Sequence, residues 1–178
     1  VLEVMIPYFS ELYGNPSSMH SFGGQVAKTI HEAREKVAAL IGADPEEIIF
    51  TSCGTESDNT AILSSLSVYP EKRHIVTSRV EHPAVKVLCE HLKERGCIIT
   101  ELPVDSEGRL DMELYERSLS KDTAIVSLMW ANNETGVIFP VEKAAQIARE
   151  KGILFHTDAV QAVGKIPINM KANNIDML

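Results

Sequence analysis

Apolar positions follow two periods along the chain, and these periods predict its helices and strands. Between residues 21 and 40, apolar residues recur at steps of three and four, and Gly42 follows, which is typical of an amphipathic helix that ends at a glycine. Pro83 and Pro140 open two later periodic segments, since proline fits the first turn of a helix. Short apolar runs between such segments predict strands at 46–51, 74–77, 97–102, 123–129 and 153–156.

The alternation of strands and helices predicts an α/β fold with a mostly parallel sheet and helices on both faces. The helix that follows residues 46–51 is expected to begin at a capping box made by Thr55 and Asp58. A turn signal at 14–18 marks residues 1–20 as an N-terminal arm and turn segment. Residues 175–178 have the pattern of a further buried strand at its opening, so we expect the fold to be incomplete at both ends.

Composition narrows the class of protein without naming its chemistry. The 178 residues are 44% hydrophobic, which is enough to bury the core of one domain. Seventeen basic against 25 acidic residues give a net charge of −8, which argues against nucleic acid or an anionic membrane as the main partner. Three cysteines without a Cys-x-x-Cys pair predict neither a disulfide framework nor a zinc site, and fit the cytoplasm.

Loops that follow the predicted strands carry the candidate chemistry, because parallel sheets bind ligands beyond the carboxyl ends of their strands. Gly54 and Thr55 stand at a helix N-terminus, whose free N–H groups and dipole favour a phosphate. Thr55 as a plain helix cap is the alternative. His82, held between a strand and Pro83, presents a flat ring for stacking, although a lone histidine is more often structural.

Two later loops add an amide and an acid. Asn133 is placed to donate to a ring oxygen, and Asn-Asn in a loop is otherwise ordinary turn chemistry. Asp158, with Gln161 beyond it, ends an apolar strand and is placed to pair with a protonated ring nitrogen. Taken alone, Asp158 fits equally a metal ligand, a cap or a general base.

A phosphate cradle, a stacking ring, a donor for an oxygen and an acid for a pyridinium nitrogen together describe pyridoxal 5′-phosphate, whose protonated ring is the better electron sink. Spacing alone predicts only a phosphate-containing cofactor in an α/β protein, and no metal. A dinucleotide-binding domain is the alternative, but no Gly-x-Gly-x-x-Gly follows any strand.

At these residues the sequence resembles the cysteine desulfurases of the aminotransferase class-V, fold-type I group, and most closely the nitrogen-fixation type. The resemblance runs in the family's order and spacing over nearly the whole chain. Its segments are Gly14-Asn15-Pro16-Ser17-Ser18 with His20, Phe50-Thr51-Ser52-Cys53-Gly54-Thr55-Glu56-Ser57, Val80-Glu81-His82-Pro83-Ala84-Val85, Asn132-Asn133-Glu134-Thr135-Gly136, and His156-Thr157-Asp158-Ala159-Val160-Gln161-Ala162-Val163-Gly164-Lys165.

The resemblance implies a pyridoxal phosphate enzyme that takes sulfur from L-cysteine, leaves L-alanine and passes a persulfide toward iron–sulfur cluster assembly. It implies a sulfur-acceptor or scaffold protein as partner, a homodimer, and a cofactor-binding large domain over residues 1–178. It also implies a role for each candidate: Gly54 and Thr55 bind the phosphate, His82 stacks on the ring, Asn133 lies by the ring hydroxyl and substrate, Asp158 pairs with the ring nitrogen, and Gln161 contacts the ring hydroxyl. His82 and Asp158 would be the catalytic residues.

The family's Schiff-base lysine and nucleophilic cysteine have no match in this chain. Lys165 and Lys171 do not occupy the lysine position, and the three cysteines, which we expect to be buried or half-buried thiols, do not match the nucleophile. We therefore expect these 178 residues alone to be inactive. A selenocysteine lyase, another class-V enzyme and a non-catalytic scaffold on the same fold are the alternatives.

Overall fold

The computed structural model describes residues 1–178, which form two compact units, Val1–Ile49 and Phe50–Leu178. The second unit contains a four-stranded sheet of β1 (His74–Ser78), β2 (Ile98–Leu102), β3 (Thr123–Ser127) and β4 (Leu154–His156). All three strand pairings are parallel, as the sequence predicts. The assignment of residues 1–178 to one cofactor-binding domain stays a prediction.

The strand order β2-β1-β3-β4 reverses the direction of winding between β1 and β3. The chain moves from β1 outward to β2, and then crosses to the other side of β1 to form β3 and β4. Loops that leave such a reversal point diverge and open a crevice at the carboxyl ends of the strands. The loops after β1 and β3 are therefore the ones that flank the crevice.

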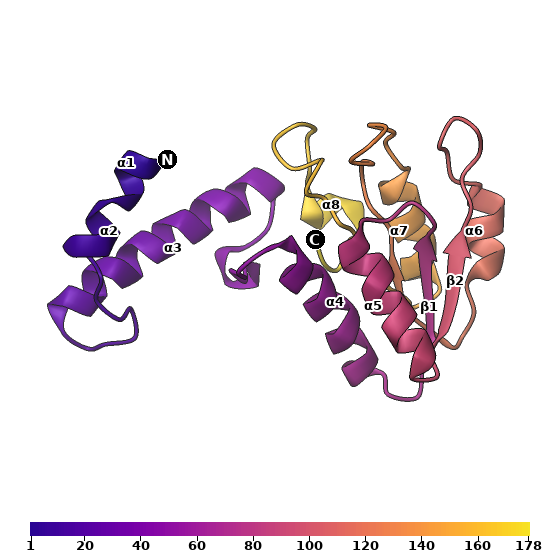
Figure 1. Ribbon diagram of the computed structural model, residues 1–178, viewed down its shortest axis with the longest axis horizontal. Coiled ribbons are helices and arrows are strands. Elements are labelled where there is room, and N and C mark those ends of the chain that lie inside the picture. Colours follow the sequence, from indigo (N-terminus) through magenta and orange to yellow (C-terminus); the bar gives the residue numbers. More distant parts are fainter. The chain divides into compact units, whose positions relative to one another are not determined.

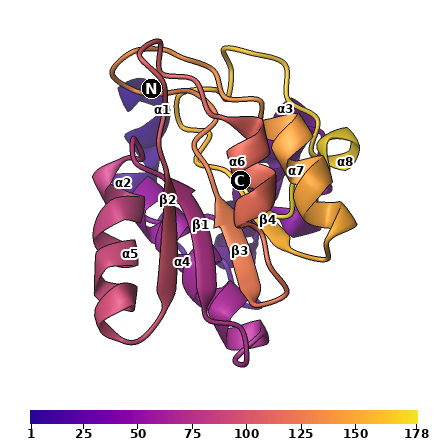
Figure 2. The same cartoon turned by 90° about the vertical axis from the view of Figure 1, so that its right-hand side faces the viewer.

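Helices cover both faces of the sheet, because successive strand residues point to opposite sides. Ile75 and Ile125 pack into a buried cluster with α4 (Gly54–Val68) and α5 (Pro83–Glu94). Val76 and Val126 pack into the opposite cluster, with α6 (Met112–Ser118) and α7 (Val141–Glu150). Figures 1 and 2 show the strands between these two layers of helices. The arrangement confirms the predicted α/β architecture.

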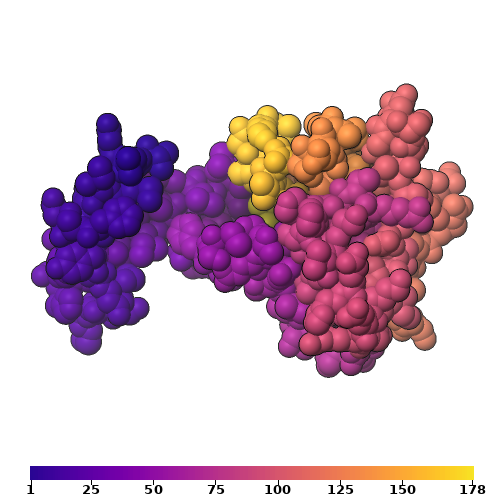
Figure 3. All heavy atoms as spheres, viewed as in Figure 1, coloured from indigo at the N-terminus to yellow at the C-terminus, as the bar shows by residue number.

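At residues 175–178, where the sequence predicts the opening of a buried strand, the structure has a single parallel bridge beside β4, and only Ile175 is buried. His156 pairs with Met177, and the Asp176 carboxylate accepts from the Phe155 N–H at 2.8 Å. The preceding helix α8 (Met170–Asn173) is tied to α7 by the Arg149 guanidinium, which donates to Asn174 Oδ1 at 2.8 Å. Figure 3 shows this yellow segment against the orange segment that contains α7. None of the helices is long and apolar enough to cross a membrane.

The first unit consists of α1 (Leu2–Met5), α2 (Pro7–Ser10), α3 (Ser21–Ile41) and a 3₁₀ turn, η1 (Pro45–Glu47). The predicted turn at 14–18 packs against the start of α3. A methyl group on Gly14 would lie 2.7 Å from the Phe22 carbonyl oxygen, and one on Gly23 would lie 2.4 Å from that of Asn15. Glycine is therefore required at both positions, because the two backbones meet without room for a side chain.

Two local predictions are wrong. Residues 46–51 form no strand: Asp44 and Glu47 instead close the 3₁₀ turn, with the Asp44 N–H donating to Glu47 Oε2 at 2.8 Å, and Ile49 is 78% exposed. Thr55 does not cap α4, because the helix already begins at Gly54 with Cys53 as its N-cap residue. The Glu56 carboxylate accepts from the Ser52 N–H at 2.7 Å at this helix start.

His74 joins three strands at the amino edge of the sheet. Its Nδ1 lies 2.8 Å from Thr123 Oγ1 on β3, and its Nε2 lies 2.8 Å from Thr100 Oγ1 on β2. Burial lowers the pKa of His74 and outweighs the nearby Asp122 carboxylate, which raises it. The neutral ring is therefore the form that the folded protein holds.

We expect His74→Gln to lower the free energy of unfolding by about 1–2 kcal/mol at neutral pH, the cost of two buried hydrogen bonds. The unfolded chain takes up a proton at His74 near the ordinary histidine pKa, whereas the folded chain resists it. The free energy of unfolding of the wild type should therefore exceed that of the variant by less and less as pH falls below about 6.5. Urea unfolding at about pH 7.5 and about pH 5.5 measures it, with His91→Gln on the exposed face of α5 as control. A difference that does not change with pH would contradict the prediction.

Candidate functional site

Two buried side chains join the loops that follow β1 and β3. Glu81 is 4% exposed, and its carboxyl accepts from the Met129 N–H at 3.0 and 3.1 Å and from the Ser78 hydroxyl at 2.5 Å. Asn132 donates from Nδ2 to the Val80 carbonyl at 3.1 Å. These bonds fix the position of the loop that carries His82 relative to the loop that carries Asn133.

The loop after β4 joins the same edge from the other side of β3. The Trp130 N–H donates to the Asp158 carbonyl at 2.9 Å, so the loops after β3 and β4 are connected through their backbones. Within its own turn Asp158 accepts from the Val160 N–H at 3.0 Å through Oδ1, which orients the carboxylate. Gly54 lies beside this turn, since a methyl group placed on it would come within 3.4 Å of Val160 Cγ2.

The structure thus brings the predicted residues to one edge of the sheet. Gly54 and Thr55 are the first two residues of α4, and both are exposed. His82 is exposed, and its Nδ1 accepts from the Ala84 N–H at 3.2 Å as the N-cap of α5. This contact fixes the start of the helix and leaves Nε2 at the edge.

The amide candidates are less firmly held. Asn133 is exposed and donates to Glu134 Oε1 at 3.0 Å, while Gln161 is half-buried and accepts from Lys165 Nζ at 2.6 Å. Asp158 is half-buried as well.

Of the three cysteines, which we expect to be buried or half-buried, Cys89 and Cys97 are buried. Cys53 is exposed, so the prediction is wrong for this residue.

Three carboxyl groups lie close enough beneath this edge to affect each other. Burial raises the pKa of Asp58, on α4, to about 7, and the negative charge of Asp158 adds to the shift. Burial raises the pKa of Glu81 to about 8, against the hydrogen bonds from Ser78 and Met129, and the charges of Asp158 and Asp58 raise it further. No lysine or arginine forms an ion pair with any of the three.

The charges at this edge of the sheet restrict the kind of ligand that can bind there. An anionic group among buried carboxyls is stabilised by a positive charge beside it, and a protonated ring nitrogen supplies one. The exposed N-terminus of α4 supplies the opposite, a positive potential and free N–H donors suited to a phosphate. A ligand with a cationic ring and an anionic phosphate therefore fits the residues present. No group of three or more His, Cys, Asp or Glu side chains is placed to hold a metal.

Sequence reasoning missed four buried residues that organise this edge: Asp58, Glu81, Asn132 and His156. In the sequence Asp58 matches a capping box, and the other three lie within two residues of predicted site residues. Polar residues within or beside apolar segments were the available signal, since such groups are buried only with partners. The partner of each buried polar residue depends on which strands are neighbours in the sheet, and the sequence does not reveal the strand order.

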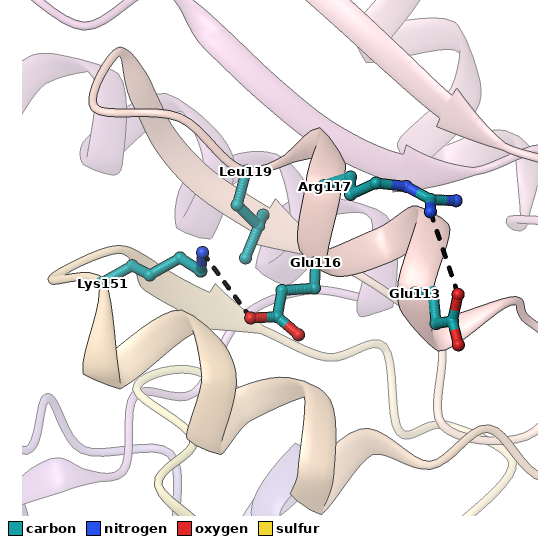
Figure 4. Close-up of a pocket in the computed structure, with 5 residues that line it drawn as sticks. All are labelled: Glu113, Glu116, Arg117, Leu119 and Lys151. Atoms are coloured by element: carbon teal, nitrogen blue, oxygen red, sulfur yellow. Dashed lines mark ion pairs between the residues drawn. The ribbon is translucent and has the colours of Figure 1, made fainter.

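A hollow of about 420 Å³ lies at the opposite edge of the sheet, lined by Glu113, Glu116, Arg117, Leu119 and Lys151 (Figure 4). Leu119 precedes β3 and Lys151 precedes β4, so this hollow is at the amino ends of the strands. Its charged residues form two exposed ion pairs, Lys151 with Glu116 at 3.9 Å and Arg117 with Glu113 at 3.8 Å. Exposed pairs of this kind are ordinary surface features.

Comparison with known proteins gives one consistent result. The family model described as aminotransferase class-V matches residues 1–178. A cysteine desulfurase of Nostoc sp. is 57% identical over 178 residues, which is 100% of this chain and 44% of that protein. Among solved structures, a NifS-like protein superimposes with a TM-score of 0.94 at 42% identity, over 98% of this chain and 49% of its own. The structure described as SspA in complex with cysteine gives a TM-score of 0.95 at 35% identity, over 99% of this chain and 51% of its own. The chain thus spans about half the length of the proteins it matches.

Proposed function

Because the chain belongs to the aminotransferase class-V family, we propose that it forms the pyridoxal 5′-phosphate pocket of a cysteine desulfurase. The observation that carries the proposal is the meeting of three strand-end loops and the α4 N-terminus at one edge, with Asp158 beside buried carboxyls that no lysine or arginine neutralises. A ring cation and a phosphate are the two charges that this edge accommodates.

Each candidate residue has a part in holding the cofactor. Free N–H groups at Gly54 and Thr55 would bind the phosphate, as helix N-termini do. His82, fixed as the N-cap of α5, would stack on the ring, and Asp158 would hold the proton on the ring nitrogen. Asn133 and Gln161 would turn their amides to the ring hydroxyl, with Asn133 also toward substrate.

When bound, pyridoxal phosphate supplies an electron sink for the carbon from which a proton is removed. The contribution of this chain is then electrostatic. Asp158 is oriented by the Val160 N–H, so its carboxylate would hold the ring nitrogen without rearrangement, and such preorganisation is worth more than flexible charge pairing. Glu81 and Asn132 hold the neighbouring loops in register, so the stacking and amide groups keep their spacing.

The substrate we propose is L-cysteine, with L-alanine as product and the sulfur passed as a persulfide to an acceptor or scaffold protein of iron–sulfur cluster assembly. The support is the family and the 57% identity to a protein named cysteine desulfurase. A homodimer in the cytoplasm is the corresponding expectation. The Schiff-base lysine and nucleophilic cysteine would be supplied by sequence that these 178 residues do not contain.

The test uses the complete gene product, reconstituted with pyridoxal phosphate and supplied with L-cysteine. We expect equal amounts of L-alanine and sulfide in the presence of a thiol, and none from the 178-residue chain alone. L-selenocysteine, assayed in parallel, distinguishes a selenocysteine lyase. Binding of the cofactor without turnover of either amino acid would favour the non-catalytic scaffold and overturn the proposed activity.

A further inference from the structure

Beneath the candidate site, a row of polar residues crosses the sheet where apolar residues are expected. Thr77, Ser127 and His156 are register partners on β1, β3 and β4. Ile75, Ile125 and Leu154, which lie two positions before them, pack against α4 and α5. Because every second residue of a strand points to the same side, the three polar side chains face the same layer of helices. They are 1%, 0% and 1% exposed. Polar side chains this deep in a small sheet are costly unless they are paired.

Asp58 enters the row from α4 and is its acidic end. Its Oδ1 lies 3.5 Å from His156 Nε2, and His156 Nδ1 lies 2.9 Å from Ser127 Oγ. Burial lowers the pKa of His156 to about 4, so the ring is neutral and does not neutralise the acid. The other charged groups that Asp58 meets are Asp158 and Glu81, and both are acidic. Among the elements packed on α4, the buried residues of α5 and β3 carry no charge.

We propose that Asp58 holds a proton in the free protein and releases it to solvent when a cationic pyridine ring binds beside Asp158. The inference rests on the proposed function, because it needs a ring cation at that carboxylate. Before binding, the charge of Asp158 and the buried surroundings both favour the protonated acid. The ring cation offsets the charge of Asp158, so the anionic form of Asp58 becomes less costly.

The part of the row that runs from Asp58 through His156 to Ser127 accommodates both protonation states, whereas Thr77 Oγ1, buried in the same row, has no hydrogen-bond partner in either. With Asp58 protonated, its O–H faces His156 Nε2, and the Nδ1–H donates to Ser127 Oγ. With Asp58 ionised, the ring carries its proton on Nε2, facing the carboxylate, and the Ser127 hydroxyl donates to Nδ1. In the change one O–H bond of Asp58 breaks, one proton leaves to buffer, and the ring changes tautomer. No oxidant or further reactant is required.

The experiment measures protons released on binding of pyridoxine 5′-phosphate, which carries the ring nitrogen and the phosphate but no aldehyde to react with a lysine. Calorimetric titration of the cofactor-free complete protein, in buffers that differ in ionisation enthalpy, gives the number of protons. At pH 7 we expect wild type to release about half a proton more than Asp58→Asn, because a group with a pKa of about 7 is half-protonated there. The excess should disappear well above that pH. Asp122→Asn, at the amino edge of the sheet, is the matched control and should release as many protons as wild type.

The outcomes separate this inference from the proposed function. Equal proton release by wild type and Asp58→Asn, with binding intact, overturns the role of Asp58 alone. Absence of binding to the wild type overturns both. If Asp58→Asn does not fold, carbon-13 NMR of the wild-type aspartate carboxyl groups decides: a resonance that titrates near pH 7 and moves to lower pH with ligand supports the proposal. Titration of every aspartate at its ordinary pKa contradicts it.

Discussion

Asp158→Asn in the complete gene product should lower turnover of L-cysteine on the order of 10²- to 10³-fold, the scale of losing one preorganised charge at a reacting system. Asparagine keeps an oxygen for the Val160 N–H, which bonds to Asp158 at 3.0 Å, so the turn is retained while the negative charge is lost. The ring nitrogen would then lose the group that keeps it protonated. Steady-state release of alanine, at saturating cofactor, measures the loss.

The affinity of Asp158→Asn for the cofactor should fall much less than its turnover. The N–H groups that we propose to bind the phosphate belong to Gly54 and Thr55, on a different element from Asp158, and the substitution leaves them in place. Asp158→Glu, which restores the charge one methylene further out, should recover part of the lost rate. Near-normal turnover in Asp158→Asn would remove Asp158 from the centre of the proposed mechanism, whatever the affinity for cofactor.

The contrast between Asp158 and Asp58 shows how far the sequence predicts this site. Asp158 directly follows an apolar run, so its place at a strand end can be read from local pattern, and the structure puts it there. Asp58 lies within a helix whose apolar periodicity is weak, and its local context resembles a cap. Its contact with His156 joins residues 98 positions apart, and only the order of strands brings them together.

The wrong strand at 46–51 has a comparable cause. Ile48, Ile49 and Phe50 form an apolar run of strand length, but a strand is stabilised by a neighbouring strand and a buried face. Ile49 and Phe50 are 78% and 50% exposed and meet neither condition in this chain. In β1 and β3, by contrast, the same kind of run is buried at every position. The largely exposed run of β2 is a strand all the same, because it pairs with β1 along its whole length. A neighbouring strand to pair with therefore separates the runs that form strands from the run at 46–51.

Glu81→Ala should lower the free energy of unfolding by about 2–4 kcal/mol, because it leaves a buried N–H without an acceptor and creates a cavity. The carboxyl of Glu81 is the acceptor for Met129 N–H, and Glu81 is 4% exposed. Urea unfolding at neutral pH measures the change. Glu81→Gln is the matched variant, since it keeps the length and one acceptor oxygen, and it should cost clearly less than alanine.

The pH dependence of the Glu81→Gln variant tests the electrostatic part of the argument. Burial raises the pKa of Glu81 to about 8 in the folded protein, whereas the unfolded chain releases the proton near 4.5. Between these values the folded state binds the extra proton, so the contribution of Glu81 to stability falls as pH rises. Glutamine has no proton to lose, and the stability of Glu81→Gln relative to wild type should therefore increase from pH 5 to about pH 8. A relative stability that stays constant over this range would mean that Glu81 is ionised in the folded protein, with the hydrogen bonds from Ser78 and Met129 offsetting the cost of burial.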